Sequence, residues 1–324
     1  MCTKKYMTMK RILVIVLCSL CVQVLCAQEM LVLPYEATGL TDEQKAMNPE
    51  RLAYPTELKE SIKSEVSFEC TSQVVELGPF SVSETKTVMF SSGNLQYQPS
   101  TKTWRFAEHQ WEVIGEGNNL NIPIPSASWI DLFGWGTGNN PTYTSPISGD
   151  FSSFTDWGVN AISNGGNEAN MWHTLTKDEW EYLIHGRKNA EKLFGLGTVH
   201  GLQGTILLPD DWATPSGVTF TPSTEKGLVW DDLDYYYNGN KDNYSHNTYM
   251  ASEWDKMESA GAVFLPAAGF RDCLGGMSLV GACGHYWSST PSGSEFAWNL
   301  IFDSGIVSML YLTRCTGFSV RLVR

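Results

Sequence analysis

The C-terminal end of the chain carries three blocks in which apolar residues dominate. These blocks are Gly261–Arg271, Gly284–Thr290 and Gly317–Arg324. The first contains an apolar run that ends at Pro266, and the last alternates apolar and polar residues with a period of two. Both patterns are typical of strands that pack against a core. We therefore predict three buried strands in this part of the chain.

Two segments between these blocks show no regular period. Asp272–Cys283 and Ile306–Thr316 mix Cys, Leu, Ala, Tyr, Thr and Gly in an order that fits neither a helix nor a strand. We predict that both are loops held by the surrounding strands. Because binding residues are commonly displayed on loops above a rigid frame, residues 271–316 are the predicted ligand-binding region.

Two helices are predicted from capping residues and helical spacing. In His173–Arg187, Thr176 and Glu179 form a capping box ahead of apolar residues that recur with a helical period. A shorter helix is predicted over Ser252–Ser259, capped by Ser252. A hairpin is predicted around Pro99–Thr101. Most of the tryptophans fall in strand-like blocks, which favours a role in core packing.

The N-terminal part of the chain differs in composition from the rest. Residues 1–27 combine a basic start with a short apolar run, which predicts a signal peptide and hence export to the periplasm, the cell surface or the medium; a retained anchor is the alternative. Residues 28–78 are richer in charge, and we predict a spacer with a short helix over Thr41–Met47. The main domain is predicted over 79–324.

Charge and cysteine usage narrow the possible functions. The formal net charge is −13 and no cluster of Lys and Arg occurs, which argues against binding nucleic acid or an anionic membrane surface. Four cysteines remain after the predicted signal peptide, and they allow three pairings among which the sequence does not choose. These cysteines are Cys70, Cys273, Cys283 and Cys315.

Metal binding has only weak support in the sequence. Carboxylates in the Gly- and Asn-rich region after residue 115 offer oxygen ligands of the kind that calcium prefers. The candidates are Asp131, Asp150, Asp156 and Glu168. Their spacing matches no known calcium loop, so solvated loop carboxylates are the favoured interpretation, and no metal or other cofactor is predicted.

Several separate motifs together resemble one protein family. They are HTLTKDEWEYL at 173–183, YWSST at 286–290, SVRLVR at 319–324, and further blocks at 91–111 and 129–140. The span 79–324 resembles the C-type-lectin-like domain of exported gut Bacteroidetes proteins, which is similar to the Fibrobacter succinogenes major paralogous domain and more distantly to formylglycine-generating enzymes. The resemblance implies an α+β fold, the formylglycine-generating-enzyme-type variant of the C-type-lectin-like fold, with twisted antiparallel strands, two main helices and long loops.

The resemblance leaves an enzyme and a lectin as alternatives. Formylglycine-generating enzymes use a reactive cysteine pair, and here His285 follows Cys283 by two positions while Arg314 precedes Cys315, but no surrounding motif matches that active site. Calcium-dependent lectins of this fold carry a Trp-Asn-Asp triplet, which in this chain has Leu300 in place of the ligating Asp. A calcium-independent carbohydrate-binding lectin and a formylglycine-generating-enzyme-like oxidase are therefore alternative functions.

The favoured hypothesis is a non-catalytic, exported binding or adhesion protein with variable loops. Related lectin-like proteins include targets of diversity-generating retroelements, which rewrite adenines, and the loop residues fit the set that rewritten Asn codons encode. We expect these residues to form one ligand-binding patch with Tyr311 and Leu312 as anchors. The predicted ligand-binding residues are Asp272, Cys273, Leu274, Ala282, His285, Ile306, Leu310, Tyr311, Leu312, Thr313, Cys315 and Thr316. The ligand, a protein or a glycan, is not specified by the sequence.

Overall fold

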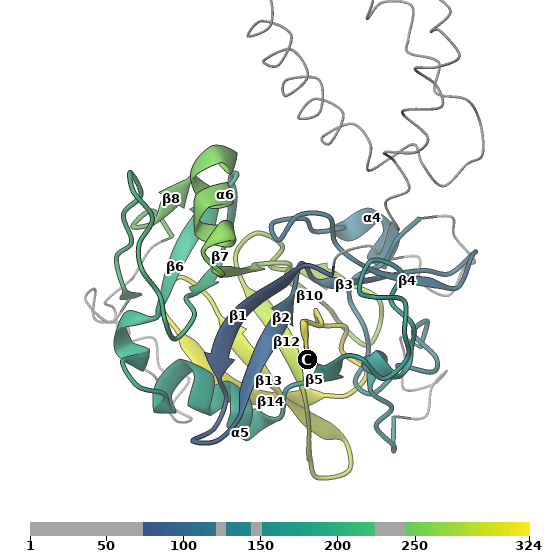
Figure 1. Cartoon of the computed structure of the whole chain (residues 1–324). Helices are drawn as coiled ribbons and strands as arrows, with labels where there is room; N and C mark the ends of the chain where they lie inside the picture. The colour runs from purple at the N-terminus through teal and green to yellow at the C-terminus, as the bar shows by residue number, and fades with distance from the viewer. Residues whose placement is uncertain (1–73, 121–127, 144–150, 224–243) are drawn as a thin grey trace, which may run out of the picture. The chain divides into compact units, whose positions relative to one another are not determined.

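A computed structural model describes residues 74–120, 128–143, 151–223 and 244–324 (Figure 1). All the described residues belong to one compact unit, Cys70–Arg324. The predicted signal peptide, and the spacer as far as residue 73 with its short helix, lie outside the described residues. The first described strand starts at Glu76, three residues before the predicted start of the main domain.

The described residues form a mixed α+β structure in which strands dominate, as the sequence predicts. The strands that precede residue 250 are β1 (Glu76–Ser81), β2 (Thr87–Ser91), β3 (Leu95–Gln98), β4 (Thr103–Phe106), β5 (His173–Thr174), β6 (Phe194–Val199), β7 (Leu202–Leu207) and β8 (Thr248–Tyr249). The strands that follow residue 260 are β9 (Val263–Pro266), β10 (Phe270–Arg271), β11 (Met277–Ser278), β12 (Gly284–Ser292), β13 (Phe296–Phe302), β14 (Val307–Thr313) and β15 (Leu322–Val323).

The strands form several small sheets whose neighbours are almost all antiparallel. The larger sheets have the orders β1-β2-β15-β5, β8-β6-β7-β9 and β12-β13-β14, and β3-β4 and β10-β11 are two-stranded. Only β6 and β8 pair in parallel among the named strands of the described residues. The last strand, β15, lies between β2 and β5, so that Val323 pairs with both Phe90 and His173.

The caps of the helices agree with the sequence only in part. The helices are α4 (Glu116–Asn119), α5 (Lys177–Glu181) and α6 (Ala251–Ser259), with a π-helical turn η5 (Tyr182–Gly186) and 3-10 turns η4 (Trp157–Val159) and η6 (Ala190–Lys192). The capping box at the start of α5 is confirmed: the Thr176 hydroxyl accepts from the Glu179 N–H, and the Glu179 carboxylate accepts from the Thr176 N–H at 2.8 Å. The predicted cap at Ser252 is wrong, because α6 begins at Ala251 and its N-cap is Met250.

Aromatic side chains fill the core. The prediction that most tryptophans pack inside is confirmed, since the indole rings at positions 104, 135, 157, 172, 180, 254 and 287 are buried. Under the C-terminal strands, Trp287 and Phe318 lie 4.4 Å apart between ring centroids and belong to one buried cluster with Phe133. This cluster supports the segments from which the predicted ligand-binding loops leave the fold.

One predicted loop is a strand. Residues 306–316 were expected to be irregular, yet β14 pairs with β13 over its whole length, from Val307 opposite Phe302 to Thr313 opposite Phe296. Val307 and Met309 are buried on one side of this strand. The other predicted loop, 272–283, is irregular as expected except for the two residues of β11. The hairpin predicted at 99–101 is also confirmed, because it joins β3 and β4.

Replacing Tyr286 with Phe tests the buried hydrogen bonds that join β12 to neighbouring segments. The Tyr286 hydroxyl donates to the Pro266 carbonyl at 2.9 Å and accepts from the Asn94 side-chain amide at 3.1 Å. Removing it leaves both partners buried without this hydrogen bond, so we expect a loss of about 1–3 kcal/mol in the free energy of unfolding by urea. The control is Tyr311→Phe, because Tyr311 is exposed and should change by less than about 0.5 kcal/mol. Equal effects of the two substitutions would contradict the assigned hydrogen bonds.

Candidate binding loop and its disulfide

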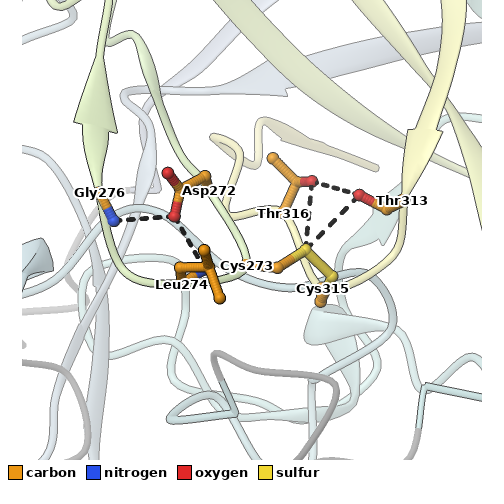
Figure 2. Close-up of a disulfide and its surroundings, with 7 residues drawn as sticks. All are labelled: Asp272, Cys273, Leu274, Gly276, Thr313, Cys315 and Thr316. Carbon is orange, nitrogen blue, oxygen red and sulfur yellow. Dashed lines mark hydrogen bonds between the residues drawn. A yellow bond between two sulfur atoms is a disulfide. The ribbon is translucent and has the colours of Figure 1, made fainter.

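A disulfide joins the two segments in which the sequence places the binding residues. Cys273 and Cys315 are bonded, with 5.2 Å between their Cα atoms and a sequence separation of 42 (Figure 2). The structure therefore selects this pair from the four cysteines, whereas Cys283 is a free, buried thiol and Cys70 lies outside the described residues. Because two of the three loop cysteines are paired, their presence needs no explanation by random codon change.

Threonine side chains surround the disulfide and join the ends of both segments. The Cys273 sulfur lies 3.5 Å from the Thr313 hydroxyl and 3.9 Å from the Thr316 hydroxyl. The two hydroxyls are 2.8 Å apart (Figure 2). The Thr316 N–H also donates to the Thr313 carbonyl at 3.0 Å. The end of β14 is therefore bound both covalently and by polar contacts to the start of loop 272–283.

Asp272 fixes the tip of this loop. One of its carboxylate oxygens accepts from the backbone N–H groups of Leu274 and Gly276, both at 2.8 Å (Figure 2). The Asp272 N–H donates to the Gly276 carbonyl, and Gly275 takes the positive φ of 97° that closes the turn. The Leu274 side chain is consequently held on the outside of the loop, where 93% of its surface is exposed.

Exposed aliphatic residues gather on loop 272–283. Besides Leu274, the loop exposes Leu279 at 55% and Val280 at 37%, and we call these three residues the apolar loop surface. Sequence reasoning misses Leu279 and Val280. The signal that could have identified them is an adjacent aliphatic pair inside a glycine-rich segment that has no core-facing period.

The structure does not bring all the predicted residues into one patch, because β14 alternates its side chains between two faces. Tyr311 packs against Trp298 at 5.1 Å on one face, while Leu312, on the other face, is half-buried against the cluster that contains Trp287 and Phe318. Leu310 pairs with Asn299 on the same side as Leu312. Tyr311 is 43% exposed, whereas the expectation of Leu312 as an exposed anchor is not supported.

Several predicted binding residues are buried. His285 is 3% exposed, and Cys315 and Thr316 are each 7% exposed, so these three side chains support the loops rather than meet solvent. The partly buried residues of the predicted set are Asp272, Cys273, Ile306, Leu310, Leu312 and Thr313, and Ala282 is exposed together with Leu274 and Tyr311. The exposed part of the predicted set is thus small, and most of it lies on loop 272–283.

The free thiol lies beside an imidazole. The Cys283 sulfur is 3.4 Å from His285 Nε2, and His285 Nδ1 is 3.0 Å from the Asn299 side-chain oxygen. Burial raises the pKa of the Cys283 thiol to about 12, with a smaller contribution from the charge of Asp303, and burial lowers the pKa of His285 to about 4. At neutral pH both groups are therefore uncharged, which differs from the thiolate that a reactive cysteine requires.

Two of the carboxylates considered as calcium ligands accept hydrogen bonds from backbone amides, and a third, Glu168, is exposed. Asp156 accepts from the N–H groups of Gly158 and Thr174, both at 2.9 Å. Asp131 is buried and accepts from the Ile114 N–H and the Asn119 amide, and burial raises its pKa to about 6. Within the described ranges, no group of three or more His, Cys, Asp or Glu side chains is placed to hold a metal ion. Asp150 lies outside these ranges.

Sequence comparison finds a match to a family model over part of the chain. Residues 233–323 match a family described as a domain of unknown function (DUF8237), and this span includes loop 272–283, the disulfide and β14. No curated protein and no solved structure matches the chain. Among the described residues, no helix has the length and apolar character needed to cross a membrane.

Removal of the disulfide should destabilise the domain without unfolding it at room temperature. The Cys273→Ser/Cys315→Ser double variant should lose about 2–4 kcal/mol in the free energy of unfolding by urea, because the bond closes a long loop in the unfolded chain. Adding reductant should lower the stability of the native protein and leave the double variant unchanged. A Cys283→Ser variant that showed the same loss and the same response to reductant would assign the bond to a different pair.

Proposed function

We propose that the protein is an exported, non-catalytic binding or adhesion protein that captures its ligand with the apolar loop surface on a C-type-lectin-like scaffold. The observation that carries this proposal is the placement of Leu274, Leu279 and Val280, three exposed aliphatic side chains on one loop that is tied down by a disulfide. Exposed apolar patches on folded proteins commonly mark binding sites. Tyr311, on β14, extends the set of exposed residues near the disulfide-bonded end of that strand.

The rigidity of the loop favours binding. Asp272 and the disulfide hold the backbone around Leu274 in a single turn, so that little conformational entropy is lost when a ligand covers it. Complete burial of one exposed leucine or valine side chain contributes about 1.5–3 kcal/mol. Two or three such side chains, held in place beforehand, are therefore enough to anchor a ligand of moderate affinity.

The scaffold assignment rests on motifs that meet in space. The block that starts at His173 contributes β5 and α5, YWSST lies in β12, and the closing block ends in β15. Leu322 pairs with Thr174, the Ser289 N–H donates to the Leu175 carbonyl at 2.9 Å, and the Lys177 N–H donates to the Thr290 hydroxyl at 2.9 Å. Three segments distant in sequence, on which the resemblance to C-type-lectin-like proteins depends, thus contact each other around the main helix α5.

Diversification of the loops by a retroelement is part of the proposal, within limits set by packing. The disulfide forms only if both cysteines are kept. Independent rewriting of the codons for Cys273 and Cys315 would replace at least one of them in most variants, and the bond would be lost. His285 and Thr316 are buried, so most substitutions there would disturb the core. Variation is therefore compatible with the exposed positions, chiefly Leu274 and Ala282 on the loop and Tyr311 on β14.

Charged substitutions on the loop test the binding role. The Leu274→Asp/Leu279→Asp variant and the native protein would be tested for binding to an array of purified glycans and extracellular proteins. We expect the variant to lose roughly 10-fold or more in affinity for any array component that the native protein binds, because two anchors become charged. The matched control is Val159→Asp, an exposed valine at 41% on a different surface segment, and it should bind normally. Equal losses in both variants, or none in the loop variant, would overturn the proposal.

Sequencing of the gene tests diversification independently of any ligand. Codons 271–316 would be read from many cells of one lineage. We expect substitutions at the first two positions of the codons for Leu274, Ala282 and Tyr311, which correspond to the adenines of an Asn codon in the template, and unchanged codons for Cys273 and Cys315. A uniform sequence would remove the retroelement from the proposal and leave a fixed binding module. Frequent loss of one cysteine without the other would show that the disulfide does not constrain the variation.

A further inference from the structure

Next to Cys283, at the end of loop 272–283, lies a buried polar side chain that the binding function does not explain. The His285 ring on β12 stacks on Phe318, with 4.4 Å between ring centroids and 11° between planes, and meets the edge of Phe270 at 5.4 Å. Both ring nitrogens have polar neighbours, the Asn299 oxygen at 3.0 Å from Nδ1 and the Cys283 sulfur at 3.4 Å from Nε2.

The hydrogen bonds of Asn299 determine which nitrogen of His285 carries the proton. The Asn299 amide nitrogen donates to the Leu310 carbonyl at 2.8 Å, so its oxygen is the atom that faces the imidazole. An oxygen can only accept, and Nδ1 must therefore carry a hydrogen. Nε2 of the neutral ring then has a free lone pair and accepts from the Cys283 thiol.

Cys283 is also the residue that anchors the end of the loop. Its N–H donates to the Leu279 carbonyl at 3.1 Å, and its carbonyl accepts from the Gly269 N–H at 2.8 Å. The preceding residue, Ala282, donates to the same Leu279 carbonyl at 3.0 Å. The position of Leu279 and Val280, two of the three residues of the apolar loop surface, thus depends on how Cys283 sits against β12.

We propose that Cys283, His285 and Asn299 form an acid-sensitive latch that releases segment 279–283 of the binding loop when His285 takes up a second proton. A proton on Nε2 removes the acceptor of the thiol and places a positive charge between Phe270 and Phe318, where burial disfavours it and, among the described residues, the hydrogen bond with Asn299 is the contact that opposes this effect. Opening of the segment lets the imidazolium reach water. The role of the latch in ligand release rests on the proposed binding function, whereas the opening itself does not.

The charged groups on the neighbouring elements act on residues other than His285. On β10, Arg271 is followed by Asp272, and the charge of Asp272 acts on Arg271. At the turn between β13 and β14, the charge of Asp303 acts on Cys283. The pKa of His285 is set by burial, which lowers it, and by the hydrogen bond with Asn299, which opposes that shift.

The direction of the pH dependence follows from where the extra proton binds. In the closed loop the pKa of His285 is about 4, and in an opened, solvated loop it returns to about 6.5. The open form therefore binds the proton first, so opening is favoured progressively as the pH falls from about 6.5 to about 4, with no further gain below that. Between pH 7 and pH 5 the open fraction should rise roughly 20-fold.

The reactivity of Cys283 measures this opening without any ligand. The full chain would be treated with 4,4′-dithiodipyridine, which modifies thiols in acid as well as at neutral pH, and modification of Cys283 would be quantified by peptide mapping. Its rate would be divided by that of a free peptide with the sequence around Cys283 at the same pH. We expect this ratio to rise roughly 20-fold between pH 7 and pH 5. A ratio that stays constant or falls overturns the latch.

Controls separate the latch from other effects of acid. His285→Gln has no titrating ring and should give a ratio that does not change with pH, while Asp303→Asn should keep the rise seen in the native protein. Tryptophan fluorescence must stay native at pH 5, since a rise caused by global unfolding would also overturn the proposal. A flat ratio leaves the binding role of the loop intact, because the Leu274 and Leu279 variants test that role separately.

Discussion

The last eight residues of the chain hold the domain together. Gly317 exchanges backbone hydrogen bonds with Arg271, Phe318 with Phe133, and Arg324 with Met89. Between them, the Ser319 N–H donates to the His285 carbonyl and the Val320 carbonyl accepts from the Leu95 N–H. One extended segment therefore satisfies the backbone groups of segments that are far apart in sequence, and nearly all of it is buried. A change in its course would displace β2, β12 and the base of loop 272–283 together.

This segment also determines where loop 272–283 begins. Because Gly317 pairs with Arg271, the loop leaves the fold at a fixed point, and the disulfide between Cys273 and Cys315 repeats that constraint two residues away. Phe318, on the same segment, forms the floor under His285. The loop is thus rigid at its base, through backbone pairing, a covalent bond and aromatic packing, and free of core contacts at Leu274. Such a division lets residues at the tip change with little effect on stability.

The sequence predicts the parts of the fold whose pattern is local. The strands β9 and β12, the hairpin β3–β4 and the capping box of α5 follow from runs, turn residues and helical spacing. Strand β14 does not, because its apolar residues face both sides: Val307 and Met309 enter one core cluster, and Leu312 contacts another. A strand buried on both faces has no alternation to detect. The disulfide pairing and the exposure of Leu279 depend on how segments distant in sequence pair with each other. The local patterns of a single sequence do not predict such pairing.

The buried polar group under the loop is difficult to explain by stability alone. His285 lies between two aromatic rings and Asn299 is buried beside it, and replacing both hydrogen-bond partners by apolar side chains of the same shape can be nearly neutral or stabilising. Their hydrogen bonds with each other and with Cys283 satisfy their polar atoms only while the imidazole is neutral. The anchoring of the loop at Cys283 is therefore strong while His285 is neutral and weaker once His285 is protonated. A purely structural support would not need that dependence, and a support whose strength changes with pH is the physical basis of a latch.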